Sequence, residues 1–265
     1  MDKRYTLNDT LFKYSLAKSS ESEEAFEGKG RIMVVGGVAT QLISYNKDLL
    51  RPTTDIDLII DKSVSKTERR KWAECLGQKI EKEGYPVNYG LNRYGAEVNF
   101  ANLERNLVIH LNYLGSGFFE RFRKKIEREY ERAEIYNILD TKIRCQSPMD
   151  IIINKLRRIE ILDKFNKIEL DSYKKYFLSL VKDAQFDDID TEELSDMLVE
   201  NIIDRNQTIE DISRESFDLV KKRIDQYKIY KDIYDISLII ESCRKKNMEI
   251  PSKTFRKDLK DALRE

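Results

Sequence analysis

Two aspartates, Asp55 and Asp57, have a spacing that lets their carboxylates share one ligand. They lie at the start of a short apolar run, residues 58–60, that is typical of a β-strand. Side chains two residues apart on a strand project from the same face, and two carboxylates held that close repel unless a cation lies between them. Oxygen ligands suit a hard ion, Mg²⁺ or Mn²⁺, that also takes phosphate oxygens. The pair therefore predicts a divalent metal site.

A second pattern, Gly36-Gly37, lies between an apolar run at residues 32–35 and a segment with helical spacing at residues 39–45. A strand that ends in two glycines before a helix lets the backbone approach a ligand and leaves N–H groups free at the helix start, a geometry that receives phosphate. Thr40, in the first turn of this helix, could add a hydroxyl contact. A phosphate cradle beside a two-carboxylate metal site is what phosphoryl or nucleotidyl transfer requires.

The order of these patterns resembles a known family. Gly-Gly after a strand, followed by the run Arg51-x-Thr53-x-Asp55-x-Asp57, resembles the polymerase-β-type nucleotidyltransferase superfamily, and more narrowly the AbiEii/AbiGii group of bacterial abortive-infection toxins and their relatives. Residues 147–156 and 231–236 are similar to two later segments of that family. The likeness covers about residues 31–60, 107–114, 143–158 and 228–240, in the family's order.

The resemblance implies a role for each matching residue. Asp55 and Asp57 would hold Mg²⁺ or Mn²⁺ and act in catalysis, and the residues that face the nucleotide would be Gly36, Gly37, Thr40, Arg51 and Thr53. Lys155 would reach the triphosphate or stabilise the leaving group, with Asp232 and Asp235 in support from one helix face. The residues alone leave other interpretations open. Lys155 could be a surface lysine on an apolar helix. Asp232 and Asp235 could form a solvated helix face or pair with Lys228 and Lys231.

The family's third carboxylate is missing. It belongs on a later strand, residues 107–114, whose alternation places His110 and Asn112 on one face. The family's aspartate aligns with Asn112, which can bind a metal through its amide oxygen but cannot act as a base. Three outcomes stay open: His110 serves as base or ligand, Glu97 on a neighbouring strand supplies the charge, or the protein binds nucleotide without turning it over.

The amino-acid composition excludes several other classes of protein. The 265 residues include 48 Lys and Arg, 48 Asp and Glu, and a single His. This balance argues against a general polyanion binder, and one histidine makes Ser-His-Asp hydrolysis and histidine-rich metal sites poor candidates. No apolar run has the roughly 18–20 residues of a membrane span, and we see no secretory signal. Three widely spaced cysteines favour a reducing cytoplasm.

Predicted strands cluster within residues 31–145, and the chain from residue 148 onward is helix-patterned. We therefore predict an α+β protein, with a nucleotidyltransferase-type mixed sheet flanked by helices in residues 1–146 and a helical bundle in residues 147–265. Ser65 with Glu68 forms a capping-box pattern, and Gly84 is positioned to end the helix that begins there. Residues 46–48 look like an inserted loop.

The expected activity is transfer of NMP from an NTP to an unidentified hydroxyl on tRNA, protein or a small molecule. The resemblance also implies a toxin-like role in a toxin–antitoxin or abortive-infection system, with a cognate antitoxin as partner. One alternative is a catalytically impaired nucleotide-binding or interaction protein of the same fold; another is a helical interaction protein with an accidental aspartate pair. Residues 159–227, which contain amphipathic stretches at 173–181 and 194–203, predict an enlarged bundle or a substrate-recognition surface. The basic strips at 121–125 and 221–223 are most simply solvated helix faces.

Overall fold

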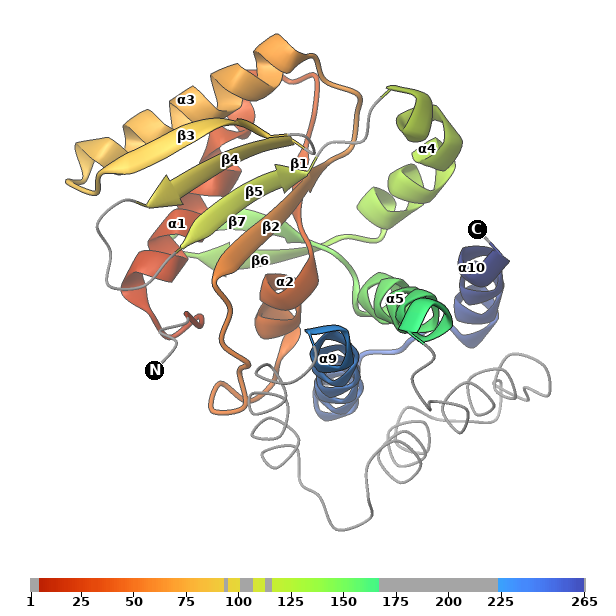
Figure 1. Ribbon diagram of the computed structural model, residues 1–265. Helices are drawn as coiled ribbons and strands as arrows, with labels where there is room; N and C mark the ends of the chain where they lie inside the picture. Colours follow the sequence, from red (N-terminus) through yellow and green to blue (C-terminus); the bar gives the residue numbers. More distant parts are fainter. Residues whose placement is uncertain (1–4, 93–94, 101–106, 113–115, 167–223, 265) are drawn as a thin grey trace. The chain divides into compact units, whose positions relative to one another are not determined.

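The computed structural model describes residues 5–92, 95–100, 107–112, 116–166 and 224–264. The chain divides into two compact units (Figure 1). One, here called the sheet unit, comprises Met1–Leu42 and Leu50–Ser147, and the other, the helical unit, comprises Ile43–Leu49 and Pro148–Glu265. The predicted fold class, a mixed sheet with flanking helices followed by helices, is confirmed for the described residues. The stretches 173–181, 194–203 and 221–223 lie outside them.

The sheet unit is built on seven strands in the order β3-β4-β5-β2-β1-β7-β6. Their bounds are β1 Ile32–Val34, β2 Asp55–Ile60, β3 Val87–Asn92, β4 Gly95–Phe100, β5 Val108–Asn112, β6 Glu134–Ile138 and β7 Thr141–Cys145. The sheet is mixed because β2 runs parallel to β5 but antiparallel to β1, while β1 runs parallel to β7. Strand β6, at one edge, has no counterpart in the sequence prediction.

The helices of this unit are α1 Thr10–Glu21, the short 3₁₀ helix η1 Ser22–Phe26, α2 Gly36–Ile43, α3 Lys66–Lys82 and α4 Ser116–Glu131. Helix α3 starts as predicted: Ser65 Oγ accepts from the Glu68 backbone N–H, and the Glu68 carboxylate accepts from the Ser65 N–H. Gly84 follows its end with φ +86°, a left-handed conformation that favours glycine. Local sequence signals thus set both ends of α3.

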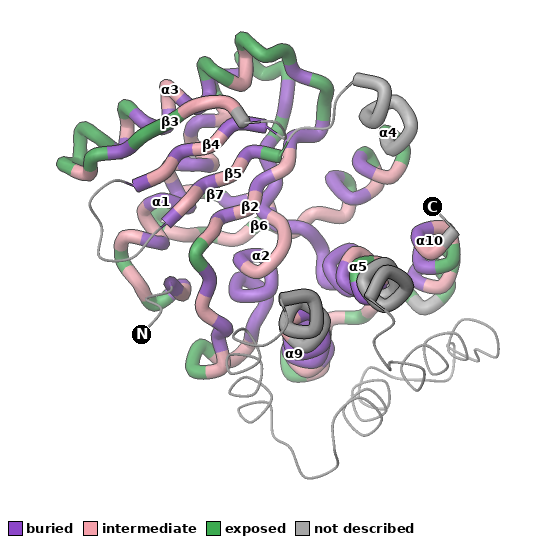
Figure 2. Tube along the Cα trace, in the orientation of Figure 1, coloured by how far each residue is buried: buried purple, intermediate pink, exposed green. Residues whose placement is uncertain are grey.

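The alternation of β2 separates the two faces of the sheet. Ile56, Leu58 and Ile60 are buried, whereas the intervening residues are only partly covered (Figure 2). Ile56 belongs to a row that crosses β5 and β4 to Tyr89 on β3, and Tyr89 lies against Gly77 of α3. Helix α3, which packs on β3 and β4, therefore lies on the side of the sheet to which the apolar residues of β2 point, and the two aspartates lie on the opposite face.

The face that carries the aspartates is covered in part by α4. Ile126 and Tyr130 of α4 pack with Met33, Val35 and Ile59 of β1 and β2. The Tyr130 hydroxyl donates to the Ile59 carbonyl over 2.6 Å. Since Ile59 lies two residues beyond Asp57, the apolar packing ends beside the candidate site.

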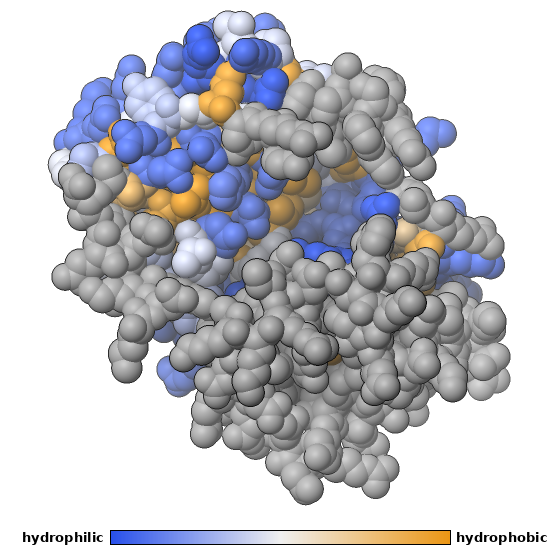
Figure 3. All heavy atoms as spheres, in the orientation of Figure 1, coloured by the Kyte–Doolittle hydropathy of each residue, from blue (hydrophilic) through white to orange (hydrophobic). Residues whose placement is uncertain are grey.

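The helical unit contains α5 Pro148–Asn166, α9 Ile224–Lys246 and α10 Ser252–Arg264. Helix α5 packs against both α9 and α10. Within the described parts of the chain, none of the helices combines the length and the apolar character needed to span a bilayer. The face in Figure 3 shows mainly hydrophilic residues over α3 and β3, and hydrophobic residues are visible among the hydrophilic ones over the sheet.

Candidate functional site

The carboxylate of Asp57 lies against the start of the glycine helix α2. Where β1 ends, the Val35 N–H donates to the Asp57 carbonyl over 3.0 Å, which fixes the level at which the chain leaves the sheet. Gly36 then turns with φ +68°, and a β-carbon built on it would lie 3.3 Å from Asp57 Oδ2. Glycine is favoured here both by the left-handed backbone and by the lack of space. The predicted phosphate cradle and one predicted metal ligand are thus neighbours.

Arg51 lies against the second glycine of the same helix. Its side chain is buried, with 5% of the residue exposed, and a β-carbon at Gly37 would lie 2.7 Å from Arg51 Nη2. Arg51 Nη1 also donates to the Pro52 carbonyl over 3.3 Å. A guanidinium beside the N-terminus of a helix adds a full positive charge to the helix dipole, and both favour an anion.

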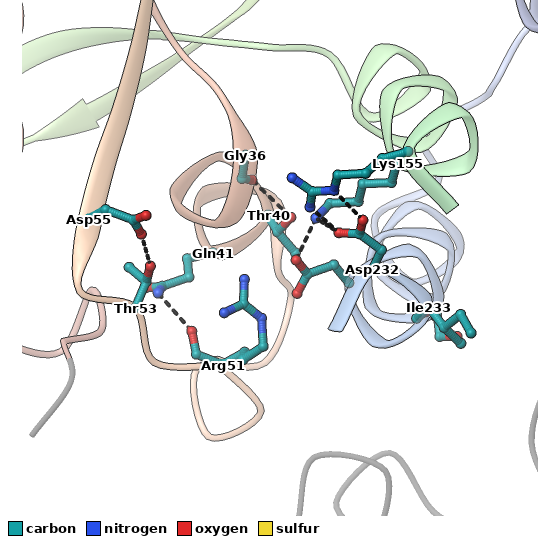
Figure 4. A network of polar contacts seen from close by, with 12 residues as sticks. Gly36, Thr40, Gln41, Arg51, Thr53, Asp55, Lys155, Asp232 and Ile233 are labelled. Atoms are coloured by element: carbon teal, nitrogen blue, oxygen red, sulfur yellow. Dashed lines mark hydrogen bonds and ion pairs between the residues drawn. The ribbon is translucent and has the colours of Figure 1, made fainter. Parts of the chain in front are cut away.

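Two threonines predicted to face the nucleotide donate to protein acceptors. The Thr53 hydroxyl donates to Asp55 Oδ1, and the Thr40 hydroxyl donates to the Gly36 carbonyl over 3.2 Å (Figure 4). Thr53 thus orients one of the two paired carboxylates, while Thr40 closes the first turn of α2. Their contact with nucleotide stays a prediction.

Gln41 on α2 positions the backbone of the site, and it was not identified from the sequence. Its Nε2 donates to the Arg51 carbonyl over 2.9 Å, and its Oε1 accepts from the Leu7 N–H over 2.8 Å (Figure 4). Only 1% of the residue is exposed. The signal available in the sequence was an amide side chain within the largely apolar segment 38–43. A buried amide needs such partners, so Gln41 ties the glycine helix to the backbone of Arg51.

The register of the sheet brings His110 beside Asp57. Asp57 pairs with His110 on β5, and His110 pairs in turn with Glu97 on β4. His110 Nδ1 lies 4.0 Å from Glu97 Oε2, and both side chains are about one-third exposed. Asn112 is exposed and pairs with Ile59, two residues further along the strand than the Asp57 pair. Two of the open alternatives for the missing third acid therefore lie in one row with Asp57.

The donor set fits an ion that is bound together with a triphosphate. In the portion of the chain that the structure describes, no three His, Cys, Asp or Glu side chains group into a metal site. Mg²⁺ in phosphate-transfer sites takes one or two protein carboxylates and completes its shell with substrate oxygens and water. Asp55 and Asp57 supply that number of carboxylates, from one face of β2.

Lys155, Asp232 and Asp235 form a buried ion cluster between α5 and α9. Lys155 Nζ lies 3.0 Å from Asp232 Oδ1 and 2.6 Å from Asp235 Oδ2, and Arg158 donates to both oxygens of Asp232 (Figure 4). Burial alone would raise the pKa of Asp232, but the charges of Lys155 and Arg158 bring that pKa below its ordinary value. The aspartates thus bind partners on α5, not only neighbours on their own helix.

No protein-family model and no curated protein matches the sequence. Among solved structures, an antigenic nucleotidyltransferase-like protein from Paracoccidioides brasiliensis is 16% identical, with a TM-score of 0.37 over 83% of this chain and 93% of its own. JHP933 from Helicobacter pylori is 14% identical, with a TM-score of 0.34 over 89% and 94%. Cid1, described as having RNA terminal uridylyl transferase activity, is 8% identical, with a TM-score of 0.27 over 60% and 42%. At TM-scores below 0.5, these likenesses do not decide the activity of this chain.

The contact of Gly36 with Asp57 predicts a selective effect of a single methyl group. Gly36→Ala should lower the free energy of unfolding by about 1–2 kcal/mol, the cost of a left-handed alanine, and should also weaken binding of Mg²⁺-NTP. The matched control is Gly84→Ala, at φ +86° with no atom within 4 Å of the added β-carbon. It should lose similar stability, measured by urea unfolding, but keep its nucleotide affinity. Equal affinities in the two variants would argue against the site.

The ion cluster predicts an acid-sensitive helical unit. Because the pKa of Asp232 is lower in the folded chain than its ordinary value of 3.8, the stabilisation is complete above about pH 4 and is lost as the pH falls through the folded pKa. Asp232→Asn should cost about 3 kcal/mol at pH 6, since it leaves the buried Lys155 ammonium with one carboxylate, Asp235, in place of two. Urea unfolding followed by circular dichroism should show this difference shrinking towards pH 3. An undiminished difference at pH 3 would contradict the assignment.

Proposed function

We propose that this chain is a Mg²⁺- or Mn²⁺-dependent nucleotidyltransferase that moves NMP from an NTP to a hydroxyl acceptor. The observation that carries this proposal is the contact of the Asp57 carboxylate with Gly36 at the start of α2. One triphosphate can then meet a metal-binding carboxylate and a phosphate-binding helix start together. The resemblance in motif order and spacing supports the same conclusion.

Each residue of the sheet unit has a separate task in this proposal. The N–H groups at the start of α2 receive phosphate oxygens, and Arg51 adds a positive charge beside Gly37. Asp55 and Asp57 hold the ion, and Thr53 keeps the Asp55 carboxylate in place. When bound, the ion neutralises charge on the triphosphate and aligns the α-phosphate for in-line attack.

Transfer requires a group that accepts the proton of the acceptor hydroxyl. The acceptor oxygen forms a bond to the α-phosphorus, the bond from that phosphorus to the oxygen bridging to the β-phosphate breaks, and pyrophosphate leaves. His110, beside Asp57 in the sheet, is the side chain placed to take this proton, and the Glu97 carboxylate lies 4.0 Å from its Nδ1.

The helical unit has a structural task in the same proposal. Lys155, Asp232 and Asp235 stabilise the packing of α5 on α9, because their charges are paired with one another. The acceptor is a hydroxyl on tRNA, on a protein or on a small molecule. A toxin-like role with a cognate antitoxin is proposed from the resemblance to the AbiEii group alone.

A second candidate is a protein of the same fold that binds nucleotide without turning it over. The observation that favours it is the residue beside Asp57 on β5, a histidine and not a carboxylate. This candidate predicts binding of Mg²⁺-NTP by calorimetry, together with no transfer of label to any component of a cell extract.

The paired aspartates should be essential for transfer. Asp55→Asn or Asp57→Asn should lower transfer by about a thousandfold, since a metal ion contributes several kcal/mol of charge stabilisation. The control is Asp140→Asn, which removes an exposed carboxylate at φ +63°, a conformation that asparagine tolerates. The assay incubates each protein with cell extract and the four NTPs, each radiolabelled at the α-phosphate. Wild-type protein that binds NTP but labels nothing would favour the second candidate, and absence of binding would remove both.

His110 should affect turnover more than binding. His110→Gln should lower kcat about a hundredfold or more, the usual effect of a general base, while the affinity for Mg²⁺-NTP changes less than about twofold. Glu97→Gln should lower kcat less, because the imidazole itself is retained. Calorimetry and single-turnover kinetics separate the two quantities. Loss of metal binding in His110→Gln would instead make the imidazole a ligand.

A further inference from the structure

Residues 43–49, here called the strap, are held by helix α9. The phenol of Tyr234 donates to the Leu49 carbonyl over 2.6 Å, and Ser242 Oγ accepts from the Tyr45 N–H over 3.1 Å. The Tyr45 hydroxyl donates to Glu241 Oε1 over 2.7 Å, and Lys246 Nζ donates to the Ile43 carbonyl. Both ends of the strap and its middle are therefore attached.

These attachments are spread along the helix and are partly buried. Positions 234 to 246 span about 18 Å of α9, at 1.5 Å per residue. Tyr234 and Ser242 are buried, and so is Ile43 at the start of the strap. A buried hydroxyl or carbonyl is costly to leave without a partner, so the contacts of Tyr234, Ser242 and Ile43 favour a strap that stays on α9.

The strap joins the two halves of the phosphate site along the chain. It begins at Ile43, the last residue of the glycine helix α2, and it ends one residue before Leu50-Arg51. Gln41 binds the Arg51 carbonyl across the base of this loop. The position of the Arg51 guanidinium beside Gly37 therefore depends on the conformation of the strap that connects α2 to Arg51.

We propose that the strap couples the helical unit to nucleotide binding, with Tyr234 and Ser242 as positioning residues for Arg51. While α9 holds the strap, Arg51 stays on the helix start and the triphosphate binds tightly. A change in α9 that releases the strap lowers the affinity. By linkage, bound nucleotide stabilises the strap on α9 to the same extent. This inference rests on the proposed function.

A pair of serines in α9 provides the test. Ser242 and Ser237 are both buried, and each donates to the carbonyl four residues earlier, but Ser242 also accepts the N–H of the strap. Ser242→Ala and Ser237→Ala thus remove the same hydroxyl from one helix, with and without the strap contact. Tyr234→Phe removes a second strap contact and keeps the ring.

The affinity for the α,β-methylene analogues of the four NTPs, each titrated with Mg²⁺ by calorimetry, is compared among these variants. We expect Ser242→Ala and Tyr234→Phe to bind about three- to tenfold more weakly than Ser237→Ala, the usual size of coupling between sites. Amide exchange of residues 36–57 should quicken in the same two variants and slow when nucleotide binds the wild-type chain. The urea midpoint of each variant reports its general loss of stability, so that a loss of affinity beyond that of Ser237→Ala is not attributed to unfolding.

The outcomes separate the two proposals. Wild-type protein that binds the analogues, with Ser242→Ala and Tyr234→Phe equal to Ser237→Ala in affinity, overturns the coupling and leaves the nucleotide site standing. Wild-type protein that binds none of the four analogues overturns the proposed function, and the coupling falls with it.

Discussion

Gly36 and the Asp57 carboxylate lie so close that a β-carbon on Gly36 would be 3.3 Å from Asp57 Oδ2. Strand β1 runs antiparallel to β2 with Val34 opposite Leu58, so the chain leaves β1 at the level of Asp57. A helix can begin there only after a left-handed turn, and glycine makes that turn without crowding the carboxylate. The negative charge of β2 and the free N–H groups of α2 meet because of this one contact. The Arg51 guanidinium on Gly37 and the amide of Gln41 build outward from it.

The alternation of β2 makes a charged site compatible with a stable sheet. Ile56 and Leu58 are fully buried on the face that α3 covers, and they contribute apolar burial to folding. Asp57, between them, need not be apolar, because it points to the other face. The same alternation in β5 places His110 beside Asp57 and sends Ile109 and Leu111 into the core. The pairing of strands thus selects the residues that can work together.

Features set by neighbouring residues were predictable from the sequence. The capping box of Ser65 and Glu68, the glycine turn before α2 and the strand that carries the aspartates all have local causes. Strand β6 escaped prediction because its hairpin turns at Leu139 and Asp140 with positive φ and no glycine.

Features set by long-range pairing were not predictable in the same way. Alignment with the family indicated Asn112, but the register between β2 and β5 puts His110 next to Asp57. The partners of Lys155 lie 77 and 80 residues away in the sequence. The attachment of residues 43–49 to α9 spans nearly 200 residues, so no local pattern announces it. In each case the sequence identifies the type of residue, but only the fold shows which residues are its neighbours.

The central claim is that one triphosphate and one divalent ion meet where Asp57 lies against Gly36. A crystal structure of the chain with Mg²⁺ and an α,β-methylene NTP analogue tests it most directly. We expect phosphate oxygens on the N–H groups at the start of α2, and the ion between those oxygens and the carboxylates of Asp55 and Asp57. A nucleotide bound elsewhere, or an ion that contacts neither aspartate, would contradict the claim.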